Sequence, residues 1–256
     1  MSNIRDESEL SFAQKLMYDR LADFLAKNLN FSRLSIILEA GCGSGQLTMP
    51  FAEKVMRVKR RCKIIAFDIS SGPYRGRLNL LKDKVKEKGL EEVIVAVEGD
   101  VRNMRAVDDE SVDLIISNEL FCDLDRRGLE MALNEFFRVL KHGGQMAHGV
   151  LSPVPQNKAQ RLLIEADSYS LEKLEPKPGW FSPSSDEVAA LMHNIGFRKI
   201  AVKYFEPNLR LSFKAALEQL KQWNTDPAFI RKRRKDLQEH GLEFPMEYII
   251  FCENPS

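Results

Sequence analysis

The stretch IILEAGCGSGQLT (residues 36–48) leads from a run of apolar residues directly into three glycines within five positions, Gly41, Gly43 and Gly45. The apolar run predicts a strand that is buried on both faces. Apolar residues at helical spacing follow from Leu47 onward and predict a helix. A strand, a glycine-rich turn and a helix in this order allow a ligand to approach the backbone closely.

The rest of the chain repeats this alternation of strands and helices. Strands are predicted at residues 34–40, 63–68, 92–100, 112–118, 145–151, 197–205 and 246–253. Helical patterns stand between most of them, which predicts an α/β fold: a doubly wound, mostly parallel seven-stranded sheet with helices on both faces. Ligands of such sheets bind at the carboxyl ends of the strands.

The 256 residues are expected to form a single domain with four parts. A capping-box pattern, Ser11-x-x-Gln14, predicts an N-terminal helix at 11–29. Residues 34–151 form the predicted ligand-binding core. The segment 152–183 holds five of the eleven prolines and is interpreted as lid-like. Residues 206–245 are predicted as a helical insertion before the last strand.

The charge and composition of the chain limit the kinds of partner that it is expected to bind. The formal net charge of +1 produces no overall field that would attract nucleic acid or an acidic membrane. No apolar run approaches the roughly 18 residues needed to cross a bilayer, and the polar N-terminus is unlike a secretion signal. The cysteines lack C-x-x-C spacing and the histidines lack metal-ligand spacing. These features predict a cytoplasmic protein without a membrane partner or a metal site.

Two common ligands of glycine-rich turns fit this one poorly. A nucleoside triphosphate loop needs a lysine after its last glycine, and none follows Gly45. The dinucleotide pattern G-x-G-x-x-G/A needs a small third residue, and Gln46 occupies that position. A turn that binds no ligand remains an alternative on this stretch alone.

The pattern present is acidic-x-Gly-x-Gly-x-Gly, beginning at Glu39, and it resembles the first motif of the class I S-adenosylmethionine-dependent methyltransferases. Three further strand ends, Asp68 in FDIS, Asp100 in EGDV and Asn118 in DLIISN, lie where this family has its later motifs. RVLKHGG (residues 138–144) resembles the family's RVLKPGG turn. The resemblance extends over about residues 30–151, and it implies an antiparallel last strand.

The resemblance also implies a role for each of these positions toward S-adenosylmethionine. The glycines would let the backbone pass beneath the cofactor, and Asp68 would accept hydrogen bonds from both ribose hydroxyls. Asp100 would accept one from the adenine amino group, with Val101 packed on the ring. Asn118 would lie near the methionine portion. The expected cofactor-binding set is Glu39, Gly41, Gly43, Gly45, Asp68, Ile69, Asp100, Val101 and Asn118.

Residues that would handle the methyl acceptor are less clearly marked. The stretch from Asn118 to Phe121 lacks the Asp/Asn-Pro-Pro-aromatic motif of enzymes that methylate planar amino groups. Glu119 and Asp123 are candidate catalytic residues that could orient an acceptor, with a solvated loop or a helix start as the alternative. Candidate substrate-binding residues are Tyr18, Tyr74, Glu119 and Trp180, for whose aromatic members burial in the core is the alternative.

The resemblance therefore predicts methyl transfer from S-adenosylmethionine by direct in-line displacement, with a small molecule as the favoured acceptor. Two alternatives stay open: a methyltransferase that acts on a protein side chain or RNA, and a cofactor-binding scaffold without catalysis. The basic run RKRRK (residues 231–235) is interpreted as a solvated helix face, with a nucleic-acid-binding patch as the alternative.

Overall fold

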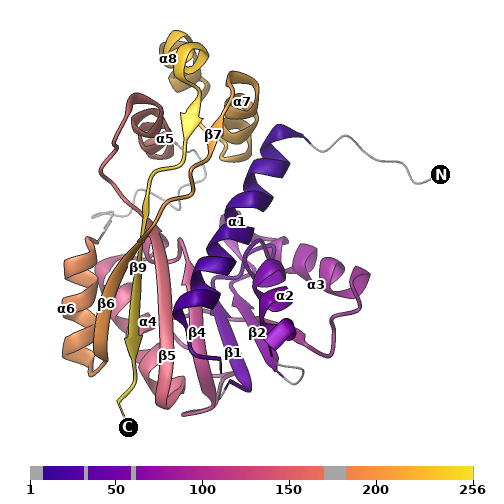
Figure 1. The fold of residues 1–256 in the computed structure, drawn as a ribbon, viewed down its shortest axis with the longest axis vertical. Helices are drawn as coiled ribbons and strands as arrows, with labels where there is room; N and C mark the ends of the chain where they lie inside the picture. Colours follow the sequence, from indigo (N-terminus) through magenta and orange to yellow (C-terminus); the bar gives the residue numbers. More distant parts are fainter. Residues whose placement is uncertain (1–7, 32–33, 59–61, 170–182, 256) are drawn as a thin grey trace.

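A seven-stranded sheet lies at the centre of the computed structural model, which describes residues 8–31, 34–58, 62–169 and 183–255 (Figure 1). Its strand order is β3-β2-β1-β4-β5-β9-β6. The strands are β1 (Ile36–Ala40), β2 (Lys63–Asp68), β3 (Ile94–Glu98), β4 (Val112–Asn118), β5 (Leu140–Leu151), β6 (Arg198–Phe205) and β9 (Glu247–Glu253). β9 is antiparallel to both of its neighbours, and the remaining pairs are parallel. The predicted α/β sheet with an antiparallel last strand is confirmed.

Helices cover both faces of this sheet, because the strands carry apolar residues on both sides. Ile37 and Leu38 of β1 are both fully buried, and they belong to different core clusters. The first cluster contains residues of α1 (Glu9–Asn28), α2 (Thr48–Val58) and α3 (Arg77–Glu87). The second contains residues of α4 (Arg126–Val139) and α6 (Ser185–Ile195).

A smaller unit stands beyond the carboxyl ends of the parallel strands, at the top of Figure 1. It consists of α5 (Lys158–Ser168), α7 (Phe213–Gln222), α8 (Pro227–His240) and an antiparallel pair, β7 (Arg210–Leu211) with β8 (Leu242–Glu243). We call these five elements the cap. They share a third apolar cluster with the first half of α1, so the long first helix connects the cap to the sheet.

Serine side chains cap the N-termini of α1 and α6. Ser184 and Glu187 form a capping box at the start of α6. The predicted start at Ser11 is wrong, because α1 begins earlier, with Ser8 as the N-cap accepting a hydrogen bond from the Ser11 N–H at 3.2 Å. Ser11 is therefore the donor of the cap and lies inside the helix.

The segment interpreted as lid-like contains α5, whose residues Leu162 and Leu163 are buried in the cap. Residues 170–182 of this segment, with Trp180, lie outside the described residues. The β7–β8 pair was not among the predicted elements, since two-residue strands carry no periodic signal. In the described ranges, no helix has the length and apolar character that a membrane span requires.

Candidate functional site

One cavity of about 330 Å³ lies where β1, β2 and β4 end and where the loop after β3 begins. Parallel strands present their carboxyl ends at one edge, which brings these segments together. The sequence-predicted residues that line it are Tyr18, Glu39, Gly41, Gly43, Asp68, Ile69, Tyr74, Asp100, Val101, Asn118, Glu119 and Asp123. Of the predicted residues, Gly45 does not line it, and Trp180 is outside the described part of the chain.

The three glycines of the first loop all adopt left-handed backbone conformations, with φ of +75° at Gly41, +53° at Gly43 and +80° at Gly45. L-residues with a side chain rarely adopt these angles. A Cβ on Gly43 would meet no atom within 4 Å, whereas one on Gly45 would lie 2.4 Å from Leu81 Cδ1 of α3. Gly43 therefore leaves open space in the cavity, and Gly45 permits helix packing.

Asp68, at the end of β2, holds the glycine loop from the neighbouring strand. Its Oδ2 accepts a hydrogen bond from the Gly43 N–H. The carbonyl of Phe67 accepts from the N–H groups of Gly41 at 2.9 Å and Cys42 at 3.2 Å. Only 7% of Asp68 is exposed, and this burial raises the pKa of its carboxyl. The loop conformation thus depends on contacts that β2 supplies.

Glu39, which lies in β1 two residues before Gly41, is a buried carboxyl group in the cavity wall. It is 3% exposed, and within the described residues its Oε2 has no hydrogen-bond partner. Burial raises the pKa of Glu39 to about 8, and the negative charge of Asp68 acts in the same direction. This carboxylate would gain free energy from a ligand that brings a hydrogen-bond donor or a positive charge.

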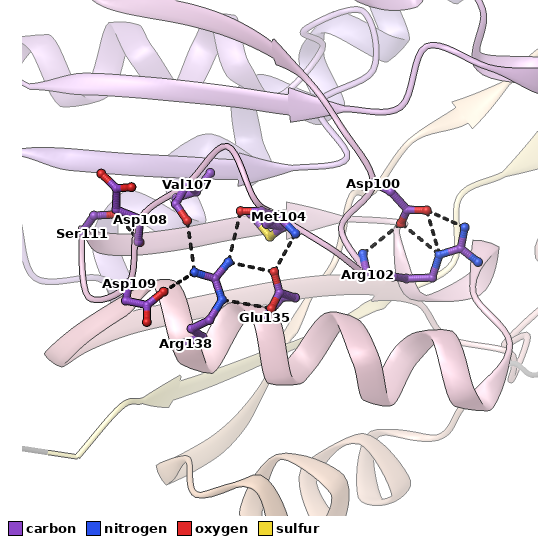
Figure 2. A network of polar contacts seen from close by, with 9 residues as sticks. All are labelled: Asp100, Arg102, Met104, Val107, Asp108, Asp109, Ser111, Glu135 and Arg138. Carbon is purple, nitrogen blue, oxygen red and sulfur yellow. Dashed lines mark hydrogen bonds and ion pairs between the residues drawn. The ribbon is translucent and has the colours of Figure 1, made fainter.

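The loop after β3 contributes Asp100 and Val101. Figure 2 shows the Arg102 side chain folded back on the Asp100 carboxylate, with its Nε 2.9 Å from Oδ1 and its Nη2 2.5 Å from Oδ2. These bonds lower the pKa of Asp100 and keep it ionised. Val101 is buried beside it. Arg102 also lines the cavity, and sequence reasoning missed it, although a cation two residues after the acidic position was visible.

Two short turns form another part of the cavity wall. Tyr74 ends the 3₁₀ turn η1 (Gly72–Tyr74), and Asp123 ends a second 3₁₀ turn, η2 (Phe121–Asp123). Burial raises the pKa of Tyr74, and the charge of Asp123 and a hydrogen bond between the two side chains raise it further. The guanidinium of Arg77 stands 5.1 Å above the Tyr74 ring. The first of these turns places Tyr74 at the cavity.

Glu119 follows β4 in a left-handed conformation, with φ of +51°. Its backbone N–H donates to the Gly149 carbonyl at 2.9 Å, and its Oε1 accepts from the Leu151 N–H at 2.6 Å. The side chain is therefore fixed against β5 and does not project from a solvated loop. Tyr18 of α1 lines the same cavity, and its pKa is raised by burial and by the nearby carboxylates of Glu247 and Glu119.

Glu247 is a further acidic residue near this site that sequence reasoning missed. It is 1% exposed at the start of β9, and within the described residues neither of its carboxylate oxygens has a hydrogen-bond partner. The only signal in the sequence was an acidic residue directly before the apolar run of the last strand. That signal is weak, because strands commonly begin with a polar residue.

Comparisons with known proteins agree with this geometry. Residues 37–144 match a family model described as a methyltransferase domain. The YcgJ protein of Bacillus subtilis has a similar structure, with a TM-score of 0.65 at 14% identity over 92% of this chain and 98% of that one. Human N-acetylserotonin methyltransferase, solved in complex with SAM, has a TM-score of 0.54 at 19% identity over 96% of this chain and 56% of that one.

A third similar structure is the [4+2]-cyclase SpnF, with a TM-score of 0.62 at 17% identity over 93% of this chain and 81% of that one. Likeness at these identities establishes the fold, and the cyclase illustrates that one fold can support different reactions. No curated protein sequence matches the chain. The methyltransferase domain match extends from β1 to the turn at the start of β5 and includes the glycine loop.

Residues 37–144 of the chain match a methyltransferase domain. S-adenosylmethionine fits the cavity on the chemistry of the cavity wall. S-adenosylmethionine offers hydrogen-bond donors in its ammonium, ribose hydroxyl and adenine amino groups, and the wall offers acceptors in Glu39, Asp68, Asp100 and Asn118. Glu39 Oε2 and Asn118 Oδ1 are buried without partners among the described residues. Open space above Gly43 leaves room for close approach.

Proposed function

We propose that this enzyme methylates a small molecule that binds in the same cavity as the cofactor. The proposal is supported by the further residues that line the cavity beside those assigned to the cofactor. Tyr18 of α1 and the hydrogen-bonded pair of Tyr74 and Asp123 line the same cavity as Glu39 and Asp68. A volume of about 330 Å³ falls in the range of small-molecule sites.

The proposed roles toward the cofactor follow from position. Asp68 binds the ribose hydroxyls while it holds the Gly43 N–H. Asp100, which follows the neighbouring strand β3, accepts from the adenine amino group while it keeps its contact with Arg102. Val101 packs on the adenine, Ile69 follows Asp68 along the wall, and Asn118 lies near the methionine portion. Gly41 and Gly43 provide the backbone surface.

When bound, S-adenosylmethionine supplies a methyl group activated by a sulfonium. The chain's own residues then contribute alignment and exclusion of water, which in well-oriented systems lowers a barrier by roughly 7–11 kcal/mol. Glu119 and Asp123 are proposed to orient the acceptor from two sides of the cavity. Their backbones are fixed: Glu119 is bonded to β5, and Asp123 to the turn carbonyl of Leu120 at 3.1 Å.

The alternative of a protein or RNA acceptor has weaker support. Part of the basic run on α8 is engaged within the cap, where Arg233 pairs with Glu165 at 2.8 Å and lies 3.6 Å from Asp236. Asp236 also pairs with Lys158 of α5 at 2.7 Å. The Arg233 contact uses one residue of the run to hold α8 against α5, which favours a structural role for that residue.

Two measurements test the proposal. Calorimetric titration with S-adenosylhomocysteine tests the cofactor site, and failure of the intact protein to bind would overturn the assigned cofactor residues. Incubation with methyl-labelled S-adenosylmethionine and separated cell fractions tests the acceptor. Label in the small-molecule fraction supports the proposal, and label confined to protein or RNA overturns it. Heat-treated enzyme provides the background.

A further inference from the structure

Glu247 carries a buried carboxyl group that makes no hydrogen bond within the described residues. It begins β9, opposite Leu151 of β5 and Phe205 of β6. It is 1% exposed, and both of its oxygens lack a hydrogen-bond partner among the described residues. A buried carboxyl group without partners costs folding free energy. An ordinary structural carboxylate would have acquired donors, so a role outside folding has to be considered.

A second unpartnered hydrogen-bond acceptor lies close to Glu247. Asn118 of β4 pairs with Gly149 of β5, and its Oδ1 is also buried without a partner among the described residues. A Cβ on Gly149 would lie 2.4 Å from Asn118 Oδ1 and 3.3 Å from Glu247 Oε2. Both oxygens therefore lie close against the α-carbon of Gly149. The Glu119 backbone N–H binds the carbonyl of this glycine.

This group of oxygens is connected to the cavity. Asn118 and Glu119 line the cavity directly. Tyr18 lines it as well, and burial and the charges of Glu247 and Glu119 raise the pKa of Tyr18. Burial raises the pKa of Glu247 well above its usual range, and the charge of Glu119 raises it further. Without a ligand, these effects favour the protonated form of Glu247. A positive donor placed among these oxygens would instead stabilise the carboxylate and supply the missing hydrogen bonds.

We propose that Glu119, Glu247 and Asn118 bind a protonated primary or secondary amine of the methyl acceptor. An ammonium carries a positive charge and two or three donors, which matches two carboxylates and one amide oxygen. A hydroxyl offers one donor and no charge, so it would leave two of the three unpartnered oxygens of Glu247 and Asn118 unsatisfied. The inference rests on the proposed function, because it assigns the acceptor's chemistry in the same cavity.

The test compares matched amines and alcohols by calorimetry on the full chain saturated with S-adenosylhomocysteine. The pairs are butylamine with butanol, benzylamine with benzyl alcohol, and 2-phenylethylamine with 2-phenylethanol. We expect at least one amine to bind tenfold or more tightly than its alcohol. Glu247→Gln and Glu119→Gln should each reduce that preference at least tenfold, because Gln keeps the shape and removes the charge. Glu53→Gln, in an exposed pair with Lys88 at 3.2 Å, is the control.

The possible results distinguish failure of the amine site from failure of the proposed function. Absence of an amine preference in every pair, or a preference that survives both glutamine variants, would overturn the amine site. If S-adenosylhomocysteine binds in that case, the proposed function is untouched. If it does not bind, the same pairs are titrated without it: a preference sensitive to Glu119→Gln would keep the amine site and reject the proposed function. Should Glu247→Gln fail to fold, the intact protein and Glu119→Gln still decide.

Discussion

The carboxylate of Asp68, at the end of β2, accepts a hydrogen bond from the backbone N–H of Gly43, in the loop that follows β1. The two residues are 25 positions apart, and adjacent parallel strands bring them together. Asp68 therefore has a structural task in the absence of any ligand. Its proposed contact with ribose hydroxyls comes in addition to that task, and substitutions can separate the two.

Asp68→Asn should weaken binding of S-adenosylhomocysteine by about tenfold or more, because a hydrogen bond to a charged group is worth about 1.5–3 kcal/mol. The amide oxygen can still accept from Gly43, so the melting temperature should change little. Asp68→Ala should lose both the affinity and part of the stability. Calorimetry and thermal unfolding measure the two effects. Unchanged affinity in the alanine variant would contradict the ribose role.

Gly43→Ala and Gly45→Ala should differ in what they damage. At Gly43 the new methyl group has open space and bears only the cost of the left-handed backbone, about 1 kcal/mol. It enters the cavity, so affinity for S-adenosylhomocysteine should fall severalfold with modest destabilisation. At Gly45 it would stand 2.4 Å from Leu81 Cδ1, so the fold should lose more stability. Denaturant unfolding and calorimetry test the contrast, and equal effects on both measurements would refute it.

The sequence allowed the sheet and most of the site to be predicted because both depend on strand ends. Once strands are placed by their apolar runs, parallel pairing forces the residues that follow them to one edge. Asp68 and Asp100 could therefore be assigned to one cavity although they are far apart in sequence. The helix start was misplaced because Ser8 and Ser11 both suit an N-cap, and only the chain's path favours Ser8.

Glu39→Gln should change how stability depends on pH. The folded pKa of Glu39 is raised to about 8 from a usual value of 4.5, so the unfolded chain releases this proton first as pH rises. Wild-type stability from this group is fully present below about pH 4.5 and is lost as pH rises through 8. Relative to the wild type, Glu39→Gln should therefore become more stable between pH 5 and pH 8.5.

The size of that gain should be of the order of a few kcal/mol, since each pKa unit corresponds to about 1.4 kcal/mol. Urea unfolding at pH 5, 7 and 8.5 measures it for the wild type, for Glu39→Gln and for Glu53→Gln as a surface control. A constant difference between wild type and Glu39→Gln at all three pH values would show that burial does not hold the proton on Glu39.

Glu247 and Arg102 could not be predicted because their meaning depends on contacts between distant segments. Glu247 is separated from Glu119 by more than a hundred residues, and the two approach only because β9 inserts between β5 and β6. Nothing in the local sequence specifies that insertion. Tyr18 was singled out from its position on the first helix, and the structure places it at the cavity because α1 runs from the cap to the sheet.

We expect Arg138 to stabilise the fold and to hold in place the loop that lines the cavity. Figure 2 shows its guanidinium between α4 and the loop after β3. It donates to the carbonyls of Met104 and Val107, both at 3.1 Å, and pairs with Glu135 at 2.8 Å and with Asp109. These contacts fasten the loop that begins with Asp100 and Val101, so the arginine of RVLKHGG has a physical function in the fold.

Arg138→Met should lower the free energy of unfolding by about 2 kcal/mol, because it removes several charge-assisted hydrogen bonds that are only partly exposed to water. Arg138→Lys should recover part of the loss, since an ammonium keeps the charge but cannot reach both carbonyls and both carboxylates. Affinity for S-adenosylhomocysteine should fall in parallel, as Asp100 and Val101 lose their support. Denaturant unfolding and calorimetry on the three proteins test this. A methionine variant as stable as the wild type would show that the loop is held by other contacts.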